Sequence, residues 1–169
     1  LHKGIQRLKA AILWQMTFPG VPSVYYGDEI GLQGYRDPYC RGTYDWENGD
    51  AELRQWTRKL IHLRNKHTAL QTGSILPIYA KGDVYGYARV IDKQKDVFGM
   101  EAENEVFIVL INRSSEPRHA SLDVRDLAAG IMVDALGDRP DIRIMRGRRE
   151  VDIPAYAGLV YQHKPAAAA

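Results

Sequence analysis

The sequence predicts two structural parts, an α/β segment followed by an all-β antiparallel sandwich. Two observations support this prediction. Residues 1–70 show the order helix, short strand, long irregular segment and helix, which is typical of an α/β barrel or a layered α/β sheet. Beyond about His67 the chain changes to short β-rich runs that are separated by Gly, Asp, Asn, Ser or Pro. Such runs with turn signals between them are typical of an antiparallel sandwich.

The α/β segment contains two predicted helices and one predicted strand. Apolar positions within 3–18 predict a largely buried helix, which ends at Pro19-Gly20. Residues 22–26 are predicted to form a short buried strand. A second helix is predicted over 51–66, with Asp50 as its N-cap and cations in its last turn, where the helix dipole favours them. The apolar positions of this second helix are Leu53, Trp56, Leu60 and Leu63.

The second part is predicted to span residues 71–165. The stretch 107–111 is continuously apolar, so it needs cover on both faces and is predicted to be the central strand. Residues 166–169 are an alanine run that is predicted to be a disordered tail. The β-rich runs lie at 75–80, 84–91, 105–112, 118–124, 131–136, 142–145, 150–153 and 158–162.

The composition excludes several classes of function. A hydrophobic fraction of 45% is sufficient for a folded core, and a net charge of +2 gives no argument for a nucleic-acid or membrane partner. Cys40 is the single cysteine, so no internal disulfide is expected and the chain fits a reducing compartment, which predicts a cytoplasmic location. The five histidines show no metal-ligand spacing, and no cofactor or metal is expected.

The irregular run 27–49 is rich in charged and aromatic residues. Carboxylates and guanidinium groups can bind sugar hydroxyls, and aromatic faces can stack on the apolar faces of sugar rings. By chemistry alone this run predicts a carbohydrate-binding lip; a structural loop, whose charges pair with each other, is an equally good interpretation. The residues concerned are Asp28, Glu29, Asp37, Arg41 and Asp45, with Tyr35, Tyr39, Tyr44 and Trp46 between them.

The run "GVPSVYYGDEIGLQGYRDPYCR...W" resembles the eighth strand and following loop of the α-amylase superfamily. Its DPxxR element, Asp37 to Arg41, is most similar to the branch of neopullulanases, cyclomaltodextrinases and maltogenic amylases. The resemblance continues through "LIHLRNKHTALQTG" and "VDIPAYAGLVY" and spans nearly the whole chain. It implies that residues 1–70 are the end of a TIM barrel, with the last strand and its flanking helices, and that 71–165 are the C-terminal β-sandwich domain.

The same resemblance implies a retaining glycoside hydrolase. Such an enzyme would cut α-1,4 or α-1,6 glucosidic bonds in starch-derived oligosaccharides, cyclodextrin or pullulan, using one carboxylate as nucleophile and another as acid/base. The family's catalytic acids are expected before Leu1, in a larger protein within which this chain begins, so no catalytic residue is assigned here. The chain alone is therefore expected to be inactive. Its expected partners are an α-glucan oligosaccharide, the rest of the barrel and, by self-association, further copies of itself.

The resemblance also implies roles for residues of the loop. Asp37 and Arg41 match residues that hydrogen-bond glucose units on the non-reducing side of the cut. Trp46 is assigned to the wall of that site, with core packing as the alternative. Tyr35 stands where the family often has a small residue. Supporting roles fall to Tyr26, Asp28 and Glu29; the last two are adjacent residues leaving a strand and would point to opposite sides, which argues against a catalytic pair.

Two rival functions concern the sandwich. It could be a carbohydrate-binding module, or it could be structural, capping the barrel or serving an oligomer interface. Its aromatic residues are expected to be exposed, but they alternate with apolar residues, which fits half-buried strands better than a flat stacking platform. These residues are Tyr79, Tyr85, Tyr87, Tyr156 and Tyr161.

Overall fold

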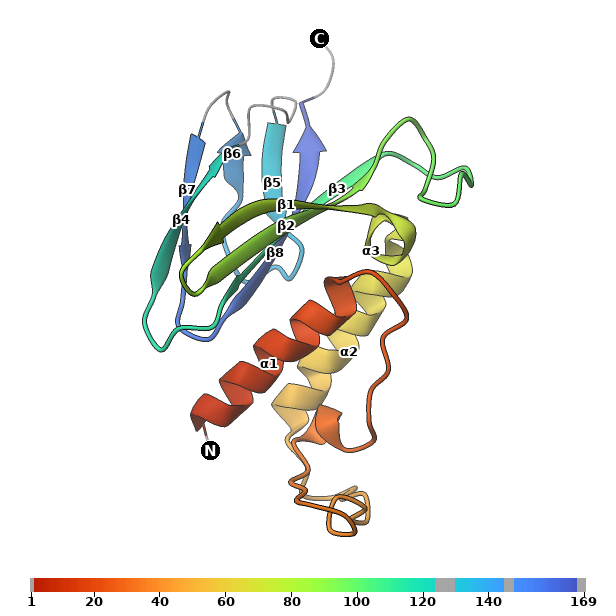
Figure 1. The fold of residues 1–169 in the computed structure, drawn as a ribbon, viewed down its shortest axis with the longest axis vertical. Coiled ribbons are helices and arrows are strands. Elements are labelled where there is room, and N and C mark those ends of the chain that lie inside the picture. Colours follow the sequence, from red (N-terminus) through yellow and green to blue (C-terminus); the bar gives the residue numbers. More distant parts are fainter. Residues whose placement is uncertain (1, 124–129, 145–147, 167–169) are drawn as a thin grey trace.

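Helices come first in the chain and antiparallel strands follow (Figure 1). The computed structural model describes residues 2–123, 130–144 and 148–166. The helices are α1 (His2–Thr17), α2 (Ala51–Lys66) and α3 (Thr68–Thr72), with a short 3-10 turn, η1 (Asp28–Ile30). The strands are β1 (Ser74–Lys81), β2 (Val84–Ile91), β3 (Glu105–Asn112), β4 (Arg118–Asp123), β5 (Gly130–Asp134), β6 (Ile142–Ile144), β7 (Arg148–Ile153) and β8 (Gly158–Pro165).

The predicted antiparallel sandwich is confirmed. One sheet has the strand order β1-β2-β3-β8-β5-β6, and β4 pairs with β7 in a second sheet. Every strand pair is antiparallel among the residues that the structure describes. Each predicted β-rich run corresponds to one of these strands. Parts of the predictions lie outside the described residues, namely Val124, Met145 and 167–169.

Both predicted helices are present. α1 ends at Thr17, before the Pro19-Gly20 pair. α2 begins after Asp50, whose side-chain Oδ1 accepts a hydrogen bond from the Leu53 amide at 2.8 Å. This bond satisfies one of the four amides that a helix leaves unpaired at its N-terminus. The helix α3, directly after α2, was not predicted from the sequence.

The predicted strand at residues 22–26 is not formed. A strand exists only when a neighbour pairs with its backbone, and within the described residues no strand lies beside this segment. Its side chains are also not buried, since Val24 is 36% exposed and Tyr25 53% exposed. The prediction of a buried strand was therefore wrong for this chain.

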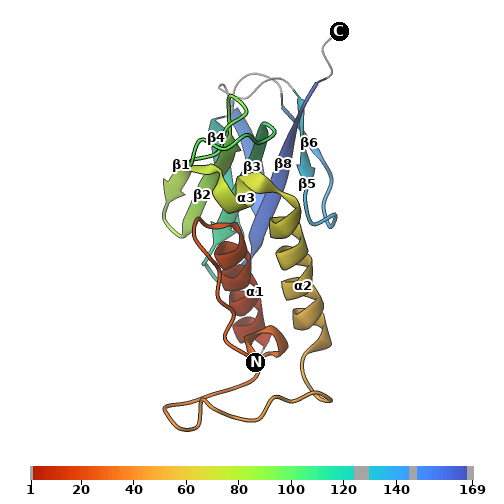
Figure 2. The same cartoon turned by 90° about the vertical axis from the view of Figure 1, so that its right-hand side faces the viewer.

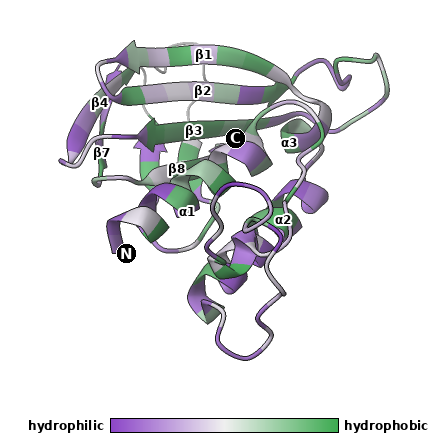
Figure 3. Ribbon diagram, turned by 60° about the horizontal axis from the view of Figure 1, so that its bottom comes forward, coloured by the Kyte–Doolittle hydropathy of each residue, from purple (hydrophilic) through white to green (hydrophobic). Residues whose placement is uncertain are grey.

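The large sheet is covered on both faces (Figures 1 and 2). On one face α1, α2 and α3 pack against Phe107 and Val109 of β3. On the other face the β4-β7 sheet packs against Ile108 and Leu110. Since successive side chains of a strand point to opposite faces, two-sided cover explains why β3 is continuously apolar from Val106 to Ile111 (Figure 3).

The helices approach the sheet closely. Leu13 of α1 is fully buried, and a Cβ atom at Gly158 of β8 would lie 2.8 Å from its side chain. Glycine at this position therefore lets α1 pack directly on the strand. The resulting hydrophobic core contains residues from both sides of the predicted boundary at 70/71, so the helices and the sheet fold around one core.

A buried arginine joins the helices to the sheet. Arg89 of β2 is 0% exposed. Its guanidinium donates hydrogen bonds to the carbonyl of Thr17 at the end of α1 (2.6 Å) and to those of Leu70 (2.9 Å) and Gly73 (2.9 Å) at α3. Burial lowers its pKa to about 10, and the nearby charge of Arg64 acts in the same direction. The side chain therefore stays cationic at neutral pH.

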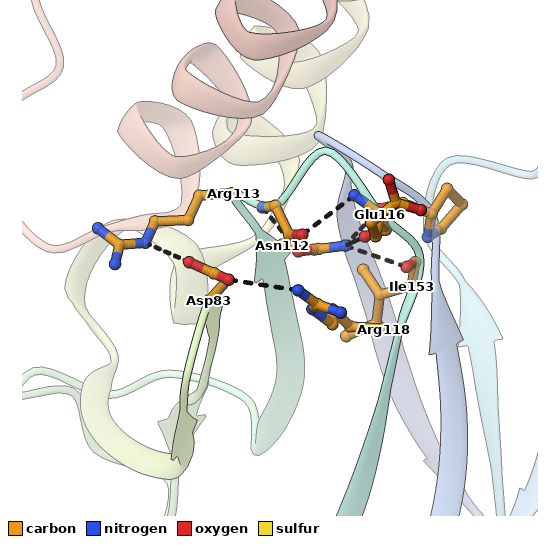
Figure 4. A network of polar contacts seen from close by, with 8 residues as sticks. Asp83, Asn112, Arg113, Glu116, Arg118 and Ile153 are labelled. Atoms are coloured by element: carbon orange, nitrogen blue, oxygen red, sulfur yellow. Dashed lines mark hydrogen bonds and ion pairs between the residues drawn. The ribbon is translucent and has the colours of Figure 1, made fainter.

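The two sheets are joined by a polar network around Asn112, at the end of β3 (Figure 4). The side-chain amide of this buried residue donates to the carbonyls of Glu116 (2.8 Å) and Pro154 (2.9 Å). Asp83 accepts from Arg113 at 3.1 Å and forms an ion pair with Arg118. The donors and acceptors of this network bind one another, which identifies the network as part of the fold rather than a binding site.

The N-cap of α2 gives a first test. Asp50→Ala should lower the free energy of unfolding by about 1 kcal/mol, because it removes the bond to the Leu53 amide. Glu103→Ala, at an exposed position, is the control and should change it by less than about 0.5 kcal/mol. Urea unfolding followed by circular dichroism measures both, and equal effects would contradict the capping role.

Candidate functional site

The candidate site is the loop from Gly27 to Gly49, which lies beyond the helices, at the end of the molecule opposite to the sandwich (Figures 1 and 2). Its base is fixed, since the Asp50 amide donates to the Ile30 carbonyl at 2.9 Å. Its aromatic side chains extend into solvent: Tyr35 is 76%, Tyr39 74% and Trp46 77% exposed.

The DPYCR segment forms a turn. The amide of Tyr39 donates to the carbonyl of Arg36 at 2.9 Å, and the amide of Arg41 donates to that of Pro38 at 3.0 Å. The guanidinium of Arg41 binds the carboxylate of Asp37 through two contacts, Nε to Oδ1 at 2.9 Å and Nη2 to Oδ2 at 3.1 Å. The turn therefore brings the two predicted sugar-binding side chains together on its surface.

The turn rests on the segment that follows α1. The Tyr26 hydroxyl donates to the carbonyl of Gly42 at 3.0 Å, and the ring of Tyr26 lies 4.9 Å from that of Tyr25. Desolvation raises the pKa of Tyr25, and its neighbours Tyr26 and Cys40 raise it further. The charge of Arg41 acts in the opposite direction, so these groups lie close together. Tyr25 was not singled out from the sequence. It was included only in the strand predicted at 22–26, and nothing in that run indicated a role in the site.

Asp28 and Glu29 lie in the η1 turn beside this segment. Burial raises the pKa of Asp28, and the adjacent carboxylate of Glu29 raises it further. Glu29 accepts a hydrogen bond from the Gly27 amide at 2.9 Å and one from the Tyr44 hydroxyl, whose pKa is raised by desolvation and by that bond. Glu29 thus links the start of the loop to Tyr44; a role for either carboxylate beyond that stays a prediction.

Trp46 does not pack in the core. Its ring lies 4.5 Å from that of Tyr44, and the rest of its surface is open. Asp45 fixes the turn that follows, because its Oδ1 accepts hydrogen bonds from the amides of Asn48 (2.8 Å) and Glu47 (3.1 Å). Chiefly the bond from Asn48 lowers the pKa of Asp45. The core-packing alternative for Trp46 is therefore wrong in this structure, and its assignment to a sugar-binding wall stays a prediction.

The loop can provide hydrogen bonds and aromatic surface. An arginine–carboxylate pair offers donors and acceptors in a fixed geometry, and exposed rings offer faces for stacking. Within the described residues no group of three or more metal-binding side chains occurs. None of the described helices is long and apolar enough to cross a membrane.

The sandwich does not present the exposed aromatics that the binding-module interpretation required. Tyr87 is 0%, Tyr161 3% and Tyr156 7% exposed, and Tyr79 and Tyr85 are half-buried. Tyr87 packs among the helices, and its hydroxyl lies 2.6 Å from that of Thr17. The expectation of exposure was wrong because both faces of the sheet are covered and because Tyr156, in the turn before β8, packs against Arg7 of α1.

Comparison with known proteins shows similarity to a segment of α-amylase family enzymes. The chain is 36% identical over 160 residues to an amylopullulanase of Thermoanaerobacter thermohydrosulfuricus, covering 92% of this chain and 11% of that protein. It is 28% identical over 158 residues to neopullulanase 2 of Thermoactinomyces vulgaris, covering 91% of this chain and 25% of that protein. The chain thus spans about a tenth to a quarter of the length of these relatives. No family model matches the chain.

Solved structures of α-amylases are also similar to this chain. An Anoxybacillus α-amylase superposes with a TM-score of 0.82 at 25% identity, covering 98% of this chain and 34% of that one. An α-amylase of Geobacillus thermoleovorans in complex with acarbose superposes with a TM-score of 0.81 at 25% identity, covering 96% of this chain and 34% of that one. The matched part is the C-terminal region of the amylase structures, with helices followed by antiparallel sheets.

The exposure of the Asp37–Arg41 pair predicts that it contributes little to stability. The two side chains are 63% and 69% exposed, and solvated ion pairs contribute about 0–1 kcal/mol. Asp37→Ala and Arg41→Ala should each lower the free energy of unfolding by less than about 1 kcal/mol. Chemical unfolding of the three proteins measures this, and a loss above about 2 kcal/mol would identify the pair as a brace of the fold.

Proposed function

Because this chain corresponds to a C-terminal segment of α-amylase family glycoside hydrolases, we propose that it belongs to a retaining enzyme that cuts α-glucosidic bonds. The substrate class would be starch-derived oligosaccharides, cyclodextrin or pullulan. The enzyme would cut α-1,4 linkages, and α-1,6 linkages are included in the proposal. The similarity to an amylopullulanase and to neopullulanase 2 supports this class without separating its members.

The observation that carries the proposal for this chain is the paired, exposed Asp37 and Arg41 on a turn that also carries the exposed ring of Tyr39, with that of Tyr35 just before it. The carboxylate would accept hydrogen bonds from sugar hydroxyls, and the guanidinium would donate them. Each group already orients the other, so little side-chain freedom remains to be lost when a sugar binds. A structural relative was solved with acarbose, which supports an oligosaccharide as the ligand.

The helical side of the molecule supports a partner, namely the rest of the catalytic barrel. Apolar side chains around the end of α1 are exposed, including Trp14 (47%), Phe18 (37%) and Val21 (97%). Exposed apolar surface of this kind is typical of an interface. A further copy of the chain would be an alternative occupant, and a cytoplasmic location remains our proposal from cysteine usage.

For the sandwich we propose a capping role. It shares one core with α1 and α2, so it holds the end of the helical segment directly. A carbohydrate-binding module remains the rival function, but its aromatic platform is missing from the described strands, where the tyrosines are buried or half-buried.

The 169-residue chain alone should show no glycosidase activity. Among the loop carboxylates, Glu29 binds the Gly27 amide and Asp37 is paired with Arg41, whereas retaining chemistry needs two carboxyl groups roughly 5–5.5 Å apart across the scissile bond. Incubation with maltotriose or cyclodextrin and chromatography of the products tests this. Turnover that is abolished by Glu29→Gln would overturn the assignment of catalysis to other segments.

In an active protein that contains this chain, Asp37→Ala or Arg41→Ala should weaken the handling of long maltooligosaccharides. Charged hydrogen bonds contribute roughly 1.5–3 kcal/mol when they are shielded from water, so kcat/KM should fall on the order of ten- to a hundredfold. Very short substrates that do not reach the loop should be much less affected. The measurement is kcat/KM on a long and a short maltooligosaccharide, beside a thermal melt.

Glu103→Ala is the control for this comparison, because it removes an exposed carboxylate from the sandwich. An unchanged preference for substrate length, together with a lowered melting temperature, would leave Asp37 and Arg41 as structural residues.

A further inference from the structure

Two buried arginines hold the backbone at the point where α1 ends and the loop region begins. Arg64 of α2 donates from Nη1 to the carbonyls of Met16 (2.9 Å) and Phe18 (3.1 Å), and from Nη2 to that of Gly20 (2.5 Å). Arg89 of β2 donates to the carbonyl of Thr17. Four of the five carbonyls from residue 16 to residue 20 are therefore fixed by side chains from two other elements.

These bonds are strong for physical reasons. The last carbonyls of a helix have no partner within the helix, and the helix dipole makes that end favourable for a cation. Arg64 is 6% exposed and Arg89 is 0% exposed, so water competes little for either guanidinium. The backbone from Met16 to Gly20 therefore has little freedom to move relative to α2 and the sheet.

The held backbone continues directly into the candidate site. Residues 21–24 make no strand pairing, and the chain then reaches Tyr26, whose hydroxyl donates to the carbonyl of Gly42 next to the DPYCR turn. Gln15 of α1 also donates to the carbonyl of Ser23, at 2.5 Å, so the position of Tyr26 depends on where α1 and Gly20 are held. The position of the turn depends in part on Tyr26.

We propose that Arg64 and Arg89 are positioning residues for the candidate sugar-binding turn, acting through Gly20 and Tyr26. Because Arg89 lies in β2, the sandwich takes part in this positioning. It therefore helps to determine the position of the turn and also covers the helices. The inference rests on the proposed function only in one respect, namely that the ligand of the turn is a sugar. The mechanical coupling itself is a property of this chain.

The alternative is that the arginines stabilise the end of α1 and have no effect on the turn. Cys40 separates the two cases, because it is the single cysteine, lies within the turn and is only partly exposed. Its rate of reaction with a thiol reagent under native conditions reports the local order of the turn. A purely global loss of stability would leave this rate nearly unchanged well below the melting temperature, because the thiol is already accessible in the folded state.

The first experiment uses Arg64→Lys, which keeps the charge but replaces the planar group that spans three carbonyls. We expect Cys40 to react about three- to tenfold faster, because the hold on Gly20 is weakened. Arg58→Lys, at an exposed position on the same helix, should leave the rate unchanged. Equal rates for Arg64→Lys and the parent chain would overturn the proposal.

A second variant tests the last link without touching a buried group. Tyr26→Phe removes the hydroxyl that binds Gly42, and the residue is 42% exposed, so the fold should keep its melting temperature. Cys40 should nevertheless react faster, whereas Tyr35→Phe on the same loop should have no effect. A normal rate in Tyr26→Phe would show that the turn is placed independently of the held segment, which contradicts the proposal.

A kinetic measurement separates this inference from the proposed function. In an active protein that contains the chain, Tyr26→Phe should raise KM for long maltooligosaccharides about two- to fivefold with kcat little changed, as expected for lost uniform binding. Faster labelling of Cys40 without this KM effect would support the positioning and contradict the sugar-binding role of the turn. A KM effect without faster labelling would contradict the positioning.

Discussion

The arrangement of this chain depends on two guanidinium groups buried at the carboxyl ends of helices. An isolated buried charge costs several kcal/mol or more, and so does a set of helix carbonyls left without donors. Arg64 and Arg89 satisfy the carbonyls, and the carbonyls in turn solvate the cations. An apolar residue in place of Arg89 would remove the donors of the buried carbonyls of Thr17, Leu70 and Gly73, and one in place of Arg64 would do the same for the buried carbonyl of Met16. The end of α1, the end of α3 and the strand β2 are thereby held in one place.

That constraint explains why the helices and the sheet share a core. Arg89 places the end of α1 against the sheet, and Gly158 allows close contact along the helix, so Leu13 becomes fully buried. The sheet can then be apolar on both faces, with the helices on one side and the β4-β7 pair on the other. A boundary near residue 70 marks a change of secondary structure along the chain, whereas the packing runs across it.

Local patterns in the sequence were sufficient for most elements. The Asp50 cap, the helical spacing after it and the apolar run of β3 each act within a few residues, so they can be read without knowing the fold. Arg64 and Arg89 could not be recognised, because their partners are backbone carbonyls 44 to 48 and 16 to 72 positions away. The prediction of a strand at 22–26 was wrong because a local pattern was not sufficient there. Its residues favour a strand, but pairing needs a neighbouring strand, which the described residues do not contain. In the candidate site the residue types indicated sugar chemistry, while the contact between Tyr26 and Gly42 depends on the folded loop.

The distribution of exposed apolar side chains bears on the rival interpretations of the molecule. A binding module would present its rings on the sandwich, where a flat sheet can support a platform. Here the described strands bury Tyr87 and Tyr161. The exposed rings lie on α1, on the segment after it and on the loop, with one further ring, Phe98, in the connection between β2 and β3. The apolar surface of α1 has the character of an interface, whereas the rings near Asp37 and Arg41 accompany charged groups that sugar hydroxyls can bind. Tyr25 and Tyr26 lie in the segment that connects α1 to the loop, and both are exposed, at 53% and 42%. If the turn binds sugar as we propose, a partner that covers this segment would strengthen the binding, because shielding from water strengthens each charged hydrogen bond.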